Sequence, residues 1–170
     1  MAECRLEHVH NCSVESFWKV FLDEKYQAAL FASMDFPRFE QTRFDEHENE
    51  IQRVIRVTPK VVGVPGPLKK VVGEGFSYEE HGTFDKKRQR FRFKIRTSKL
   101  ADKINITGII YCLPAGDGKS KRIFEATVQA KVFGVGKLLE KQIIHDMDRD
   151  YRTGAAFTND YLKQQGLAAE

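Results

Sequence analysis

The fold is decided by residues 88–98, which read RQRFRFKIRTS. Phe91, Phe93 and Ile95 alternate with basic or polar residues, and this period of two predicts a β-strand with one apolar face. Three other segments alternate in the same way, at residues 76–84, 104–113 and 121–132. Because the connections between these segments are short, we predict an antiparallel meander with one face in water and one face in the core.

Helical and strand patterns precede the meander. Residues 5–12 alternate and predict a first strand. Ser13 then provides an N-cap for a short helix over residues 14–22, and a second helix covers residues 24–33. This second helix ends before Pro37, because the residue before a proline avoids the helical region.

A hairpin and an apolar loop follow the two helices. Residues 38–45 and 50–58 flank a polar turn and predict two paired strands. Residues 59–67 contain three prolines and two glycines, which excludes a regular element, yet three valines lie among them. Such a loop is unusual because loops normally run through water. A helical turn at residues 68–72 leads into the meander.

The last element is a long helix from residue 135 to about residue 164. Its apolar positions recur every four residues, at Val135, Leu139, Ile143, Met147, Tyr151 and Ala155. We therefore predict an α+β fold in which a curved antiparallel sheet of about six to seven strands wraps around this helix. One helix covers only part of such a sheet, so either the short helices and the apolar loop cover the rest or a hollow remains.

The composition is that of an ordinary globular chain. Residues 1–170 fit a single domain, and thirteen phenylalanines suit a wide apolar interior. The net charge of +4 is too small to indicate a nucleic-acid partner. Cys4, Cys12 and Cys112 have no metal-like spacing and indicate reduced thiols, and no signal peptide or membrane-spanning run is evident. We therefore expect a cytoplasmic monomer.

This order of elements is that of the helix-grip fold, and the chain resembles the START-like (SRPBCC-type) superfamily over nearly its whole length. Residues 10–18, HNCSVESFW, look like the superfamily's opening signature, with Ser13 in place of the usual proline. Two branches are similar: uncharacterised bacterial domains described as lipid-binding-like, and the PRELI group of phospholipid-transfer proteins. Residues 53–85 are similar in layout to PRELI, where the loop acts as a lid over the bound phospholipid.

The predicted hollow and the resemblance imply binding, and transfer between membranes, of a lipid or other hydrophobic ligand. The expected cavity wall consists of Phe76, Tyr78, Phe91, Phe93, Ile95, Ile106, Ile110, Phe124, Val128, Leu139, Ile143, Met147 and Tyr151. The expected lid consists of Val61, Val62, Val64 and Pro65. Nearby lysines allow transient contact with a membrane surface. The alternative is a loop packed over the open end of the sheet.

Arg53 and His10 are the expected head-group ligands. Arg53 lies between two isoleucines on the predicted inner face, where an unpaired guanidinium is costly. Its partner is either a ligand phosphate or carboxylate or an internal acid, unless a bulge turns Arg53 outward. His8 and His10 share a face that the superfamily register turns inward; the alternative register points Val9 inward instead.

A row of four basic residues lies on the opposite, wet face of residues 88–98. The row consists of Arg90, Arg92, Lys94 and Arg96. Glu79 and Asp85 on the neighbouring strand can pair with it across the ladder. The row is either a solvated face or a patch for a membrane or a protein partner.

The sequence shows no nucleophilic triad, paired carboxylates or zinc spacing. Residues 116–120, GDGKS, resemble part of a P-loop but join two strands and lack the upstream glycine, so they are read as a turn. We therefore expect a binding protein, with no cofactor and no metal, rather than an enzyme. Two alternatives stay open: a cyclase- or hydrolase-like cavity enzyme using His8, His10 or Tyr78, and a protein-interaction module with a filled core.

Overall fold

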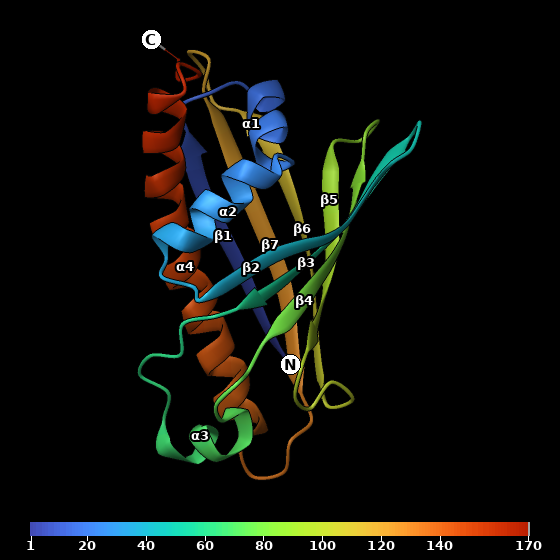
Figure 1. Ribbon diagram of the computed structural model, residues 1–170, viewed down its shortest axis with the longest axis vertical. Helices are drawn as coiled ribbons and strands as arrows, with labels where there is room; N and C mark the ends of the chain where they lie inside the picture. Colours follow the sequence, from blue (N-terminus) through green and yellow to red (C-terminus); the bar gives the residue numbers. More distant parts are fainter. Residues whose placement is uncertain (170) are drawn as a thin grey trace.

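The computed structural model describes residues 1–169, which form a curved antiparallel sheet and four helices (Figure 1). The order of strands across the sheet is β1-β7-β6-β5-β4-β3-β2. The strands are β1 (Ala2–His10), β2 (Arg38–Glu46), β3 (Glu50–Thr58), β4 (Tyr78–Asp85), β5 (Arg90–Thr97), β6 (Ile104–Pro114) and β7 (Ser120–Ala130). Each strand from β2 to β7 therefore pairs with its neighbour in sequence, as a meander requires, and β1 closes the far edge on β7.

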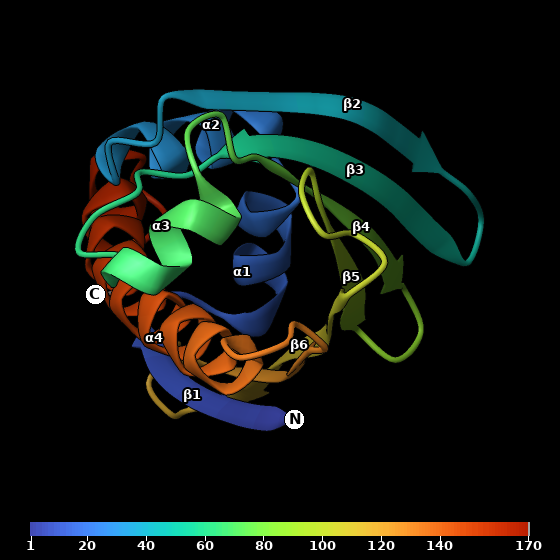
Figure 2. The ribbon, with the colours of Figure 1, turned by 90° about the horizontal axis from the view of Figure 1, so that it is seen from below.

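The helices lie on the concave side of the sheet. They are α1 (Val14–Phe21), α2 (Glu24–Ser33), α3 (Gly66–Val72) and α4 (Gly136–Gln164). Viewed along the molecule, the sheet curves around α1 and α4, and α3 lies across one end (Figure 2). This arrangement confirms the predicted helix-grip fold, with two short helices after the first strand and a long helix near the C-terminus.

The short helices begin where the sequence predicts. The Ser13 hydroxyl accepts a hydrogen bond from the backbone N–H of Ser16 and caps α1, and the Asp23 carboxylate accepts one from Lys25 N–H and caps α2. Tyr26 on α2 shares a buried hydrogen bond of 2.6 Å with Thr158 on α4. This bond ties α2 to α4.

The start of α4 is anchored to the sheet edge. The carboxylate of Glu140 accepts a hydrogen bond of 2.9 Å from the Ala130 N–H at the end of β7 and forms an ion pair with the N-terminal amine of Met1. Gly136 approaches the same strand end so closely that a Cβ atom there would lie 2.4 Å from the Ala130 carbonyl oxygen. The first turn of α4 is therefore held against β1 and β7.

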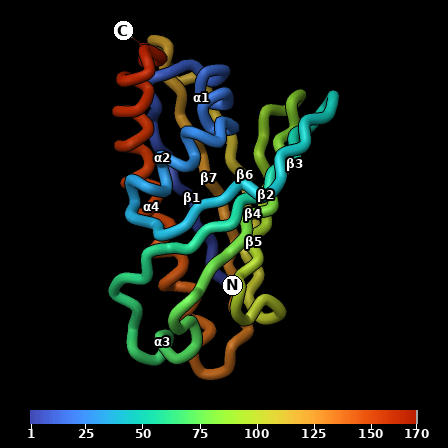
Figure 3. Tube along the Cα trace, in the orientation of Figure 1, coloured from blue at the N-terminus to red at the C-terminus, as the bar shows by residue number. Residues whose placement is uncertain are grey.

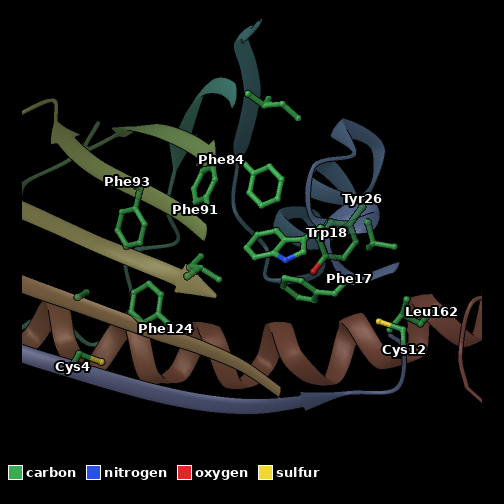
Figure 4. Close-up of a cluster of buried hydrophobic side chains, with 14 residues drawn as sticks. Cys4, Cys12, Phe17, Trp18, Tyr26, Phe84, Phe91, Phe93, Phe124 and Leu162 are labelled. Atoms are coloured by element: carbon green, nitrogen blue, oxygen red, sulfur yellow. The ribbon is translucent and has the colours of Figure 1, made fainter. Parts of the chain in front are cut away.

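The core forms two clusters, one at each end of the molecule. The first gathers aromatic rings around α1, among them Trp18, Phe84 and Phe91 (Figure 4). The second packs Leu68 of α3 against β6, β7 and the start of α4. Within residues 1–169, no helix is both long and apolar enough to cross a membrane.

Candidate functional site

A cavity of about 240 Å³ lies between the inner face of the sheet, α2, α3 and α4. Most of the predicted wall residues line it. They are Phe76, Tyr78, Phe93, Ile95, Ile106, Ile110, Phe124, Leu139, Ile143, Met147 and Tyr151. The strand residues reach the cavity because the period of two puts them on the concave face, and the α4 residues reach it because they lie on one helical stripe.

Two predicted wall residues are buried but do not line the cavity. Phe91 is fully buried, and the Arg53 guanidinium lies over its ring at 4.9 Å, where Phe21 also packs against it. Val128 is fully buried in the cluster around Leu68. The predicted face is correct for both residues, but neighbouring side chains stand between them and the cavity.

The apolar loop connects β3 and α3 (Figure 3), and some of its residues contact the cavity. Val61 and Val64 line the cavity, and Val64 also packs on the second core cluster. Val62 is half exposed and Pro65 precedes α3; neither lines the cavity. Two of the four predicted lid residues therefore line the cavity.

Arg53 faces inward and has an internal partner. Its side chain is almost fully buried; Nη1 donates a hydrogen bond of 2.9 Å to the Phe21 carbonyl oxygen, and Nη2 pairs with Glu80 Oε1 at 3.2 Å. The guanidinium is stacked between the rings of Phe21 and Phe91. Of the predicted alternatives, the internal acid is the one observed. Sequence reasoning missed Glu80, although it shares the inner face with Tyr78.

A second buried arginine, Arg122 on β7, also lines the cavity. Its Nη2 donates a hydrogen bond of 3.0 Å to His8 Nδ1, and its guanidinium lies 4.7 Å from the centre of the Tyr151 ring. Burial lowers the pKa of Arg122 below its usual range. Sequence reasoning missed this residue because the inner face of β7 was traced only from Phe124 onward, two residues later.

His8 and His10 both point to the concave side, and Val9 is 46% exposed on the other side. His10 is nevertheless not a cavity residue, because it is fully buried and stacks on the Phe17 ring at 5.2 Å. Burial, with the nearby charges of Arg122 and His8, lowers the pKa of His10 to about 3. His10 is therefore neutral at physiological pH, and its ring does not line the cavity.

Further polar groups line the cavity from α4 and β4. Arg149 pairs with Asp146 at 3.1 Å and with Asp150 at 3.0 Å. Burial raises the pKa of Asp150 and raises that of the Tyr78 hydroxyl well above its usual range. The Tyr78 hydroxyl therefore stays protonated and is available as a hydrogen-bond donor.

The basic row on the outer face is exposed, as predicted, but its expected ion pairs do not form. Glu79 lies opposite Arg96 in the ladder yet pairs with Arg56 and His81. Asp85 pairs with Arg88 in the adjoining turn. Arg56 lies on β3, on the side of Glu79 away from the row, and Arg88 lies in the turn between β4 and β5.

Comparison with solved structures places the chain among helix-grip proteins. TTHA0849 from Thermus thermophilus has a TM-score of 0.68 at 15% identity, covering 96% of this chain and 99% of that chain. The Zhui aromatase/cyclase from Streptomyces sp. R1128 has a TM-score of 0.67 at 11% identity, with 96% of both chains covered. A norcoclaurine synthase point mutant from Thalictrum flavum has a TM-score of 0.66 at 14% identity, covering 95% and 96%. Identities this low show a shared fold alone.

The fold and the cavity thus define an α+β helix-grip protein, and the resemblance to the START-like superfamily holds at that level. Within this class, the chain belongs to the family described as protein of unknown function (DUF2505), whose model matches residues 5–162. A search among curated proteins found no match.

Proposed function

We propose that this protein binds a hydrophobic small molecule in the cavity between the sheet and α4. The observation that carries the proposal is the cavity of about 240 Å³, most of whose lining residues are apolar. On the scale of cavity-creating mutations, about 24 cal/mol per Å³, an empty space of this size forfeits packing worth about 6 kcal/mol. Each methylene group that a ligand buries there contributes about 0.8 kcal/mol.

The size of the cavity favours a compact ligand. Small-molecule pockets usually span roughly 300–1,000 Å³, and this one is slightly smaller. A single acyl chain or a small ring system suits this space better than the two-chain phospholipid that the PRELI-like layout implies. A core with such a cavity also does not favour the interaction module with a filled core.

Exchange of the ligand with a membrane is the second part of the proposal. Val61 and Val62 are each about half exposed at the cavity mouth, and exposed lysines lie nearby at Lys60, Lys69 and Lys70. Apolar side chains flanked by lysines suit an anionic head-group layer. Outward movement of residues 59–65 opens the mouth and admits the ligand.

A cavity enzyme is the second candidate function, because acid–base groups line the cavity together. The protonated Tyr78 hydroxyl can donate a proton or hydrogen bond, and the Glu80 carboxylate, held by Arg53, can accept one. Two of the similar structures are an aromatase/cyclase and a norcoclaurine synthase. This candidate requires that Tyr78→Phe abolishes turnover of a bound substrate while binding persists.

Native mass spectrometry of the purified protein, with an organic extract analysed in parallel, tests the proposal. We expect a hydrophobic molecule at a one-to-one ratio. A protein that purifies empty, and stays empty after incubation with extracted cellular lipids and metabolites, contradicts the binding function. Conversion of the bound molecule during incubation supports the enzyme instead.

A further inference from the structure

Arg122 differs from the other buried arginine, Arg53, in having no acidic partner among the described residues. Arg53 is paired with Glu80 at 3.2 Å and also donates to the Phe21 carbonyl oxygen. Arg122 is only 6% exposed and lines the same cavity. Within residues 1–169, no carboxylate lies within 4 Å of its guanidinium nitrogens. The two arginines are thus similarly buried, but only Arg53 has an ion-pair partner among the described residues.

The groups around Arg122 are neutral. His8 Nδ1 accepts from Nη2 at 3.0 Å, the Tyr151 carbonyl oxygen is a distant acceptor at 3.4 Å, and Nε has no partner among the described residues. A histidine that accepts at Nδ1 from an arginine is in its neutral form, and burial together with Arg122 lowers the pKa of His8. The Tyr151 ring contributes only a cation–π contact.

Acids on α4 that line the cavity or affect His8 are engaged with other cations. Asp148, whose negative charge acts to raise the pKa of His8, pairs with Arg152 at 2.8 Å. Asp146 and Asp150 both pair with Arg149. A buried cation without a counter-ion costs several kcal/mol in proteins. Among the described residues, Arg122 is therefore a buried cation of the cavity wall without an ion-pair partner, at the place where β7 faces α4.

We infer that Arg122 is the anion-binding group of the cavity and that the ligand is a hydrophobic monocarboxylic acid, a conclusion that rests on the proposed function. The planar guanidinium fork matches the geometry of a carboxylate. One carboxylate group supplies the ion-pair partner that Arg122 lacks among residues 1–169. A doubly charged phosphate fits less well, because Glu80, Asp146 and Asp150 also line the cavity and repel excess negative charge.

Matched pairs of probes test this inference by isothermal titration calorimetry at pH 7. Each pair has one hydrophobic frame with an acid or a neutral end: decanoate with 1-decanol, and 2-naphthoate with 2-naphthalenemethanol. We expect the protein to bind at least one acid about tenfold or more tightly than its neutral partner, because a hydrogen bond to a charged group is worth that factor. Arg122→Met should remove this preference and leave the affinity for the neutral probe within about twofold.

Arg92→Met is the control, because Arg92 is exposed on the outer face and does not line the cavity; it removes the same charge and should keep the preference for the acid. Unfolding of the ligand-free proteins separates binding from structure. If Arg122 is a ligand group, Arg122→Met should be at least as stable as the parent, because it removes an uncompensated buried charge.

Should Arg122→Met fail to fold, ¹³C NMR of carboxyl-labelled decanoate bound to the parent protein decides instead. A bound carboxyl group whose pKa lies below that of free decanoic acid supports the pairing, and a raised pKa overturns it. Equal affinity for acid and neutral probes, or a preference that Arg122→Met leaves intact, also overturns the inference while the binding function stands. Failure of all four probes to bind counts against the ligand class and the proposed function together.

Discussion

The guanidinium of Arg53 and the carboxylate of Glu80 form an ion pair, 3.2 Å between Nη2 and Oε1, inside the cavity wall. The two residues lie on neighbouring strands, β3 and β4, and both side chains point to the concave face. The pair is flanked by aromatic rings, since Arg53 is stacked between Phe21 and Phe91. It gives the wall a fixed polar group without leaving a net charge.

Removing one member of this pair should destabilise the protein strongly. Glu80→Gln leaves Arg53 buried with an uncompensated charge, and we expect a loss of about 3–5 kcal/mol in the free energy of unfolding. Urea titration followed by circular dichroism measures it. Glu79→Gln is the matched control, because Glu79 forms ion pairs on the outer face and should cost no more than about 1 kcal/mol. Equal losses in the two variants contradict a buried pair.

His10 should make the protein less stable in acid. Its pKa is about 3 in the folded state, below the ordinary value of 6.5 that the unfolded chain retains. As the pH falls from about 6.5 to about 3, the unfolded state takes up a proton that the folded state excludes. His10 therefore removes up to about 1.4 kcal/mol of stability for each pH unit in this window.

His10→Leu should flatten the acid side of the stability–pH curve. It should also raise stability at pH 7, because both ring nitrogens of His10 lack hydrogen-bond partners among the described residues. Thermal unfolding between pH 3 and pH 8 measures both effects. His47→Gln, at an exposed histidine, should reproduce the parent curve. If the acid side of the curve is the same in His10→Leu and in the parent, His10 is protonated in the folded parent, which contradicts its burial.

The loop at the cavity mouth should control ligand exchange. Val64→Asp introduces a carboxylate into the apolar mouth, and we expect transfer of a pyrene-labelled fatty acid between phosphatidylserine-containing vesicles to slow by about threefold to tenfold. Val9→Asp is the control, because Val9 is 46% exposed on β1 without lining the cavity; it should transfer the ligand as the parent does. Equal transfer by Val64→Asp and the parent, in a folded protein, rules out a lid at Val64.

Hydropathy alternation predicts most of this fold because each strand has one wet and one dry face. The same period of two, followed two residues further toward the N-terminus on β7, reaches Arg122 as well as Phe124. On β4 it reaches Glu80 from Tyr78. The alternation therefore places both Arg122 and Glu80 on the inner face. They were missed because a charged residue is not expected on a face predicted to be buried.

Other features depend on tertiary packing that no periodicity encodes. The rings of Phe91 and Phe93 occupy space next to two glycines: a Cβ at Gly82 would lie 1.9 Å from Phe91 Cζ, and one at Gly108 would lie 2.3 Å from Phe93 Cζ. These contacts decide how deeply each ring lies relative to the cavity. Likewise, His10 lies behind Phe17, which comes from a different element. Sequence identifies the face of such residues but not what covers them.

The central claim is that the cavity is the ligand site, and filling it tests that claim most directly. Ile143 and Leu138 both lie on α4, but Ile143 lines the cavity and Leu138 is 38% exposed. The measurement is calorimetric binding of 1-decanol and decanoate to Ile143→Trp and Leu138→Trp, with folding checked by circular dichroism. We predict that Leu138→Trp binds as the parent does and that Ile143→Trp loses binding by about tenfold or more, because the indole occupies the ligand volume. Undiminished binding by a folded Ile143→Trp contradicts the claim.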